Sequence, residues 1–173
     1  TKRRYIVLGT ESFPEYRDIE WERFASVDDA VEAIRGQTNY DGIVYSAPQN
    51  SSGLTKSLLD LQKLCRIEET PVFVVGRMGQ AVVDSVAPVN ACAHAMAAAL
   101  RTIAQELSSS RIKILDLPAG DSLGLCEALL YRGGSLEIAL RDGKLYAPRL
   151  LRYVSDAPSA SAADSKKTHV ILG

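Results

Sequence analysis

The chain has 173 residues, of which 46% are hydrophobic and 24% charged, and its formal net charge is −1. This length and composition are typical of one globular domain with a sizeable core. The small net charge excludes the basic field of a nucleic-acid binder, and no apolar run approaches the roughly 18 residues of a membrane span. Composition therefore predicts a soluble globular protein.

The first half of the chain alternates short apolar runs with stretches of helical spacing. Ser26 is a candidate N-cap, with Asp28 and Asp29 in the first helical turn, where the helix dipole favours anions. A polar loop over residues 48–53 precedes a helix whose leucines recur on one face. The predicted elements are strands over residues 5–9, 18–25, 40–47 and 71–76, and helices over residues 26–36 and 54–65.

The second half continues this alternation. Residues 77–86 are expected to form a loop with a strand-like turn around Val82. Pro88 suits the first turn of a long alanine-rich helix over residues 88–107. A strand over residues 111–117 follows, and then a helix capped by Asp121 or Ser122 and stopped near Gly133.

Residues 136–152 predict a β-hairpin. Leu136, Ile138 and Leu140 alternate with polar residues, which suits a strand with one buried face. The Asp142-Gly143 pair favours a tight turn with positive φ, and Pro148 indicates that the return strand either lies at a sheet edge or ends there. Alternating strands and helices with this hairpin predict an α/β fold: a mostly parallel sheet with helices on both faces and an antiparallel edge.

The boundaries expected from composition are a domain over residues 1–154, a flexible linker over residues 155–167 and the first strand of a following domain over residues 168–173. The linker is small and polar. The strand stops at Gly173, where a strand-to-helix turn would begin, so we expect the natural chain to continue.

The three cysteines, Cys65, Cys92 and Cys126, form no paired motif, and each falls within a helical pattern. They are predicted to be reduced core residues in a reducing compartment, which favours a cytoplasmic protein. His94 and His169 are isolated, so we expect structural or exposed histidines and no zinc site.

Cofactor and catalytic motifs are missing from the predicted strand ends. A dinucleotide loop needs Gly-x-Gly-x-x-Gly, but only Gly9 follows the first strand, and Gly76-Arg-Met-Gly79 lacks the third glycine. No tyrosine has a lysine or asparagine four residues further on, as a short-chain reductase would require. We therefore predict no catalytic, cofactor-binding or metal-binding residue in this chain.

Three loop features have alternative interpretations. Asp116 ends the fifth strand, where α/β sheets bind ligands, but we prefer a carboxylate that caps backbone donors. Gln49, Asn50, Ser51 and Ser52 form either a small polar site or a capping loop. Gln105 and Glu106 are interpreted as a solvated helix face. An enzyme site around Asp41, Asp84 or Asp116 is a further alternative.

One segment resembles a known family. Modular polyketide synthase ketoreductases typically show an Ala-Val/Leu-Arg-x-Gly-x-x-x-x-Pro-Arg-Leu segment, and the hairpin here reads Glu137-Ile-Ala-Leu-Arg-Asp-Gly-Lys-Leu-Tyr-Ala-Pro-Arg-Leu-Leu-Arg152. Upstream, Ala104-Gln-Glu106 and Ile112-Lys-Ile-Leu-Asp-Leu117 look like the family's helix end and Val-Asp-Leu strand. Downstream, Thr168-His-Val-Ile-Leu-Gly173 is similar to the entry of the catalytic subdomain. The similarity covers residues 88–173; over residues 1–87 it is architectural.

The resemblance implies a truncated Rossmann-like structural subdomain that carries no catalytic residue and binds no cofactor, while NADPH binds the partner catalytic subdomain. The family's helix usually begins with glycine and arginine, but here it reads Asn90-Ala-Cys-Ala-His-Ala-Met-Ala. This departure favours a divergent, free-standing or pseudo-reductase element of the kind found beside methyltransferase or enoylreductase domains. The alternative function is a stand-alone Rossmann-like module that binds a small ligand near residues 48–52 and Asp116.

Overall fold

The computed structural model describes residues 2–9, 13–36, 39–67, 70–82, 89–107, 111–121, 123–131 and 134–149. Strands and helices alternate over most of this range. The strands are β1 (Arg3–Leu8), β2 (Ile19–Phe24), β3 (Gly42–Ser46), β4 (Val72–Arg77), β5 (Ile112–Leu117), β6 (Glu137–Arg141) and β7 (Lys144–Tyr146). The helices are α1 (Val27–Gly36), the short 3-10 helix η1 (Ser51–Gly53), α2 (Leu54–Leu64), α3 (Ala91–Glu106) and α4 (Leu123–Leu130).

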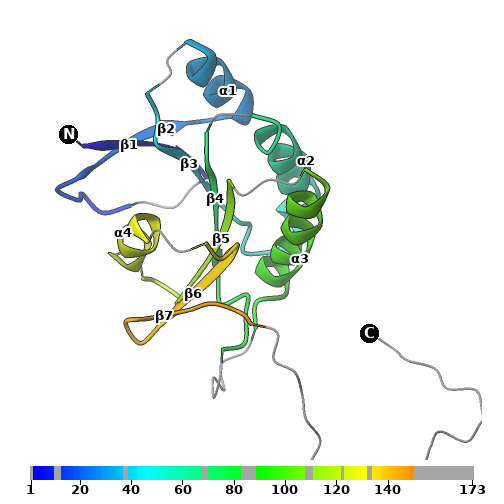
Figure 1. Cartoon of the computed structure of the whole chain (residues 1–173). Coiled ribbons are helices and arrows are strands. Elements are labelled where there is room, and N and C mark those ends of the chain that lie inside the picture. The colour runs from blue at the N-terminus through cyan, green and yellow to red at the C-terminus, as the bar shows by residue number, and fades with distance from the viewer. Residues whose placement is uncertain are drawn as a thin grey trace, which may run out of the picture.

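The described strands form one sheet in the order β2-β1-β3-β4-β5-β6-β7. All neighbours are parallel except β6 and β7, which form the antiparallel hairpin at one edge (Figure 1). The predicted α/β fold, with its mostly parallel Rossmann-like sheet and edge hairpin, is therefore confirmed. Because β2 and β3 lie on opposite sides of β1, the strand order reverses there, which is a switch point of the kind where α/β sheets often bind ligands.

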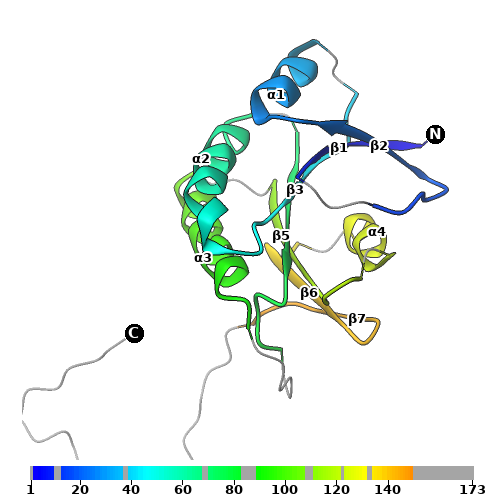
Figure 2. The ribbon, with the colours of Figure 1, turned by 180° about the vertical axis from the view of Figure 1, so that it is seen from behind.

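Helices cover both faces of the sheet, as predicted, but unequally. Figures 1 and 2 show α1, α2 and α3 along one face and α4 alone on the other. The three-helix face buries the larger core, centred on side chains such as Ile43, Leu61 and Leu100, each with no exposed surface. The α4 face buries Leu115, Leu117 and Leu125.

Aromatic side chains cover the α4 face beside β1 and β2, and the described residues between these two strands, 9 and 13–18, contain no helix. The Trp21 ring lies 5.1 Å from Phe13 and 5.8 Å from Tyr5, and the Phe73 ring lies 5.9 Å from Tyr5. Phe73 and Tyr5 meet over Gly42, where an added Cβ would lie 2.6 Å from Phe73 Cε2. These rings pack over the sheet where a crossover helix is the usual cover.

Helix α3 begins at Ala91, three residues later than the start predicted at Pro88, which itself lies outside the described residues. The Asn90 side chain accepts hydrogen bonds from the N–H groups of Cys92 and Ala93. This cap satisfies the first donors of the helix and fixes its start. Arg77, expected in the loop after the fourth strand, is the last residue of β4, whereas residues 78–82 are loop, as expected, and form no strand. Residues 83–88 lie outside the described part.

The β6–β7 hairpin turns at Asp142 and Gly143, whose φ values of 49° and 69° are those of a primed two-residue turn. One prediction about it is wrong. Strand β6 was expected to bury one face, but all five of its residues are buried. Glu137 and Arg141, on the face expected to be solvated, are 5% and 8% exposed because ion pairs accommodate them.

The linker and following strand predicted over residues 155–173 lie outside the described residues, as does the end of the domain expected at residue 154. Within the described part, no helix combines the length and apolar character that crossing a membrane requires.

Candidate functional site

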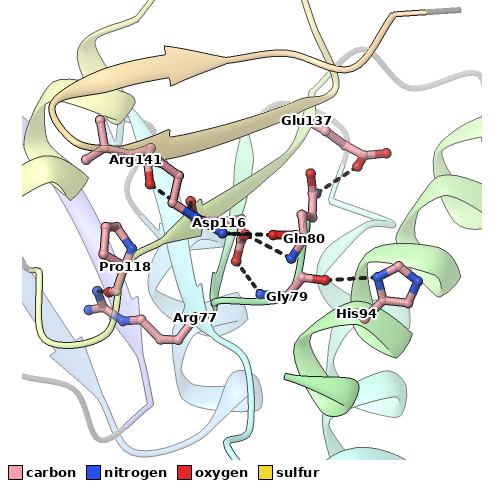
Figure 3. Close-up of polar contacts among 9 residues, drawn as sticks. Arg77, Gly79, Gln80, His94, Asp116, Pro118, Glu137 and Arg141 are labelled. Atoms are coloured by element: carbon pink, nitrogen blue, oxygen red, sulfur yellow. Dashed lines mark hydrogen bonds and ion pairs between the residues drawn. The ribbon is translucent and has the colours of Figure 1, made fainter. Parts of the chain in front are cut away.

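Several polar contacts surround the candidate residue Asp116 at the carboxyl ends of β4, β5 and β6 (Figure 3). The chain leaves β4 through a turn in which Met78 has a φ of +54°. The Met78 N–H donates to Leu117 O at 3.0 Å, and its carbonyl accepts from Asn90 N at 2.6 Å. The turn therefore links the end of β5 to the start of α3.

Asp116 lies directly behind this turn and is 2% exposed. Its Oδ1 accepts from Gly79 N at 2.7 Å, and its Oδ2 accepts from Gln80 N at 3.0 Å. Arg141 Nη2 lies 2.5 Å from the same Oδ2. Asp116 thus caps backbone donors, which is the interpretation that we preferred from the sequence, and its charge is neutralised by an arginine that sequence reasoning missed.

The buried guanidinium of Arg141 binds the turn after β4, strand β5 and its own strand, β6. Nη1 donates to the carbonyls of Asp116 and Leu140, and Nη2 also donates to the Gln80 carbonyl at 3.0 Å. Among the described residues, its Nε has no acceptor. The planar fork of arginine permits this combination of bonds, which the ammonium of lysine would not reproduce.

A second buried carboxylate lies next to the first. Glu137 forms a two-pronged ion pair with Arg101 of α3, with Nη2 donating to Oε2 at 2.7 Å. Gln80 Nε2 donates to the same Oε2 at 2.8 Å. Gln80 therefore joins both ion pairs, through its side chain to Glu137 and through its backbone to Asp116 and Arg141.

The N-terminus of α3 completes this edge. His94 is exposed, and its Nδ1 lies 2.9 Å from Gly79 O. Arg77 Nη1 donates to Pro118 O at 2.9 Å and to Asp121 O, tying the end of β4 to the entry of α4. His94 is thus a surface histidine with a structural hydrogen bond, consistent with the expectation from its isolated position.

The polar loop over residues 48–52 lies apart from Asp116. Gln49 Oε1 accepts from Asn90 Nδ2 at 3.3 Å, and Ser52 Oγ donates to Asn50 Oδ1 at 2.6 Å. Asn50 and Ser52 make no side-chain cap for η1 or α2. Of the two interpretations left open by the sequence, the capping loop is therefore not supported, because no side chain caps η1 or α2.

A small cavity lies between α3 and the sheet, beside Asp116. It is lined by Ala47, Gly76, Ala93 and Asp116 among others, and its volume of about 10 Å³ is at the lower limit for one water molecule. A larger open groove of about 560 Å³ runs along Ile19, Trp21 and Tyr16 at the other end of the sheet. That groove lies away from the predicted ligand edge.

Gly9 stands at the switch point between β1 and β3 with a φ of +121°. An added Cβ would lie 2.8 Å from Ser46 Cβ, so the glycine permits close packing of the two strand ends. Ser46 Oγ is buried there without a hydrogen-bond partner among the described residues. Close strand packing, rather than approach to a phosphate, accounts for this glycine.

The remaining candidates are dispersed. Asp41 accepts from Arg4 N at 2.9 Å at the opposite end of the sheet, and Gln105 and Glu106 are exposed, as expected. Asp84 and His169 lie outside the described residues. No group of three potential metal-binding side chains occurs in the described part of the chain.

Burial shifts the pKa of two groups that reductase chemistry would use. Burial raises the pKa of Tyr45 and lowers the pKa of Lys113. Tyr45 packs in the core under the three helices. Lys113 stands between Ile112 and Ile114, which point into the same core, so its side chain points to the opposite, α4 face of the sheet. The sheet separates the two side chains, so they cannot act as a tyrosine–lysine pair.

The cysteines are free thiols. Cys65 and Cys126 are buried, as predicted, whereas Cys92 in the first turn of α3 is only partly buried. Burial raises the pKa of Cys65 to about 11 and also raises the pKa of Cys126. Both thiols are therefore held in the neutral form, which disfavours nucleophilic or metal-binding chemistry.

Together, the fold and this site define an α/β protein with a Rossmann-like sheet whose described carboxyl edge contains the buried Asp116–Arg141 ion pair. Comparison with models of known protein families gave no match, and comparison with curated protein sequences gave none. Membership of the ketoreductase family therefore stays a prediction from the sequence segments quoted above.

Proposed function

We propose that this chain is a non-catalytic structural subdomain of a polyketide synthase ketoreductase or pseudo-ketoreductase. It stabilises the NADPH-dependent catalytic subdomain, or a neighbouring methyltransferase or enoylreductase domain, and binds no cofactor itself. The observation that carries the proposal is that Asp116 is fully bonded to groups within the chain. This carboxylate stands where an α/β sheet would present a ligand-binding group, and Gly79, Gln80 and Arg141 occupy both of its oxygens.

The position of this ion pair supports the resemblance. Asp116 belongs to the Ile-Leu-Asp-Leu segment, and Arg141 belongs to the Ala-Leu-Arg-Asp-Gly segment, which are two of the pieces that resemble the ketoreductase pattern. The two pieces meet in one buried contact. Because the two segments contact each other, their joint occurrence supports the resemblance more strongly than either segment alone.

The proposed stabilising work is mechanical. The chain would bury apolar surface against its partner, at about 25 cal/mol for each Å² removed from water. Leu145 and Tyr146 of β7 offer exposed apolar surface for such contact, each 37% exposed.

Two measurements test the proposal. Titration of NADPH into the 173-residue chain, followed by nicotinamide fluorescence, should give no binding isotherm, and a micromolar dissociation constant would contradict the structural role. In the longer polypeptide that carries the proposed catalytic subdomain, removal of residues 1–149 should abolish or destabilise the reductase. Unchanged reductase activity and unchanged melting temperature after this deletion would also contradict it.

A further inference from the structure

The sheet has two edge strands with different surfaces. On β2, Glu22 pairs with Arg4 at 3.0 Å, and Arg23 Nη1 donates to Gly9 O at 2.6 Å. Trp21 Nε1 donates to Pro14 O at 2.9 Å, which holds the preceding loop beside the strand. Charges and covering loops are the usual means by which proteins prevent another strand from pairing with an edge. Strand β2 is protected in this sense.

Strand β7 is protected at its first residue only, the exposed Lys144, and it is three residues long. Its other two residues, Leu145 and Tyr146, are large, apolar and exposed. Their cross-strand partners are Leu140 and Ala139, so the two side chains project from opposite faces of the sheet. An apolar edge of this kind is a potential pairing site for another chain segment.

The backbone of β7 leaves one residue available for pairing. The two-residue turn at Asp142-Gly143 brings Arg141 opposite Lys144 as the closing hydrogen-bonded pair. Because antiparallel pairs alternate, Leu145 then belongs to a non-hydrogen-bonded pair, and its N–H and C=O point away from β6. Pro148 lacks an N–H and restricts any added strand to this short stretch.

The base of the hairpin is held in place. Arg141, immediately before the turn, is bound to the carbonyls of Asp116 and Gln80 and to the Asp116 carboxylate. A pre-ordered edge loses less conformational entropy when a partner binds. The hydrogen bonds of Arg141 therefore hold β6 in place, and β7 is paired to this fixed strand.

We propose that the outer edge of β7 binds an extended, apolar segment of the domain that follows this chain in the same polypeptide. The inference rests on the proposed function and names the surface through which it acts. Arg149 is the third residue after β7, so the chain continues from this edge into residues 150–173. A tether that starts beside the edge raises the effective concentration of the following domain there.

The partner segment pairs through the main chain with Leu145 and places apolar side chains against Leu145 on one face and Tyr146 on the other. This is recognition by strand addition, in which backbone bonds orient the segment and side chains select it. The mixed charges along β2 offer no equivalent apolar edge.

Thiol accessibility tests the proposal. Leu145→Cys is made with Cys92→Ser, so that the other two thiols, Cys65 and Cys126, are buried. The matched control is Leu59→Cys, at an apolar residue of α2 that is 58% exposed. Maleimide labelling rates are compared between the 173-residue chain and the longer polypeptide that carries the following domain.

Labelling at position 145 should slow by about tenfold or more in the longer polypeptide, as expected when about nine-tenths of the molecules have the edge covered, while position 59 keeps its rate. Equal rates at position 145, or equal protection at position 59, would overturn the proposal. In the 173-residue chain, labelling at position 145 could instead slow as the protein concentration rises. That result would also overturn the proposal, because a second copy of the chain would then cover the edge. If the reductase needs residues 1–149 while position 145 stays open, the structural role stands and the docking edge is wrong.

Discussion

Asp116 of β5 and Arg141 of β6 form an ion pair inside the protein, with Oδ2 and Nη2 2.5 Å apart and side chains 3% and 10% exposed. The pair lies 25 residues apart in sequence and joins two neighbouring parallel strands. It also fixes the turn after β4 through Gly79 and Gln80. One carboxylate thus connects three consecutive strands of the sheet at their carboxyl ends.

Removing the arginine should be costly. In Arg141→Met, the Asp116 carboxylate stays buried without its counter-charge, and loss of one member of a buried pair typically costs about 3–5 kcal/mol. Urea unfolding should show this loss. Arg149→Met, at an exposed arginine, is the control and should stay within about 0.5 kcal/mol of the wild type. A similar free energy of unfolding for the two variants would show that the buried pair is not needed.

A side chain at Gly79 should destabilise the folded protein. An added Cβ would lie 2.8 Å from Ala93 Cβ and 2.9 Å from the Ala93 carbonyl carbon, so backbone would have to move. We expect Gly79→Ala to cost about 1–3 kcal/mol, the range for overpacking. At Gly36 nothing lies within 4 Å, so Gly36→Ala should be neutral or slightly stabilising in the same thermal or urea assay. Equal effects at the two glycines would refute the packing argument.

Asn90 and Asn50 form a matched test of helix capping. The Asn90 side chain accepts two backbone hydrogen bonds at the start of α3, whereas Asn50 makes no side-chain cap. Asn90→Ala should therefore cost about 0.5–2 kcal/mol, and Asn50→Ala only a few tenths. Free energies of unfolding from circular dichroism at 222 nm, the usual helix signal, measure both. The idea fails if Asn50→Ala is the more damaging substitution.

Alkaline pH should weaken the fold through Cys65. Burial raises the pKa of this thiol from its ordinary value of 9.0 to about 11, so the folded state retains a proton that the unfolded state releases. The contribution is fully present below about pH 9 and is lost as pH rises toward about 11. The wild type should therefore lose stability relative to Cys65→Ala across this window. Parallel curves for the two proteins between these pH values would contradict the prediction.

Much of the fold was predictable because its signals are local. The apolar runs of β1, β3 and β4, the Asp142-Gly143 turn and the helical leucines of α2 depend on neighbours in sequence, and the structure confirms each of them. The capping role of Asp116 was also within reach, because a carboxylate at the end of a strand commonly accepts backbone donors.

The features that sequence reasoning missed depend on distant contacts. The polar face of β6 was expected to be solvated, yet Glu137 and Arg141 are buried by Arg101 and Asp116, 36 and 25 residues away. A charged residue in an alternating strand normally indicates a solvent-exposed position. It can be buried only where a tertiary partner pairs with its charge, and the sequence of the strand does not reveal that partner. The start of α3 at Ala91 was missed for a different reason, because the Asn90 cap is a local signal and Pro88 gave an equally reasonable one.

The aromatic cluster beside β2 contains a built-in fluorescence probe. Trp21 is the only tryptophan in the chain, and it packs against Phe13 and Tyr5 at the β2 edge, far along the sheet from the Asp116–Arg141 pair. Its fluorescence reports loosening of that edge, while far-ultraviolet circular dichroism reports the helices. Divergence of the two melting curves would show that the β2 edge and the helices unfold in separate steps, and coincidence would show a single cooperative unit.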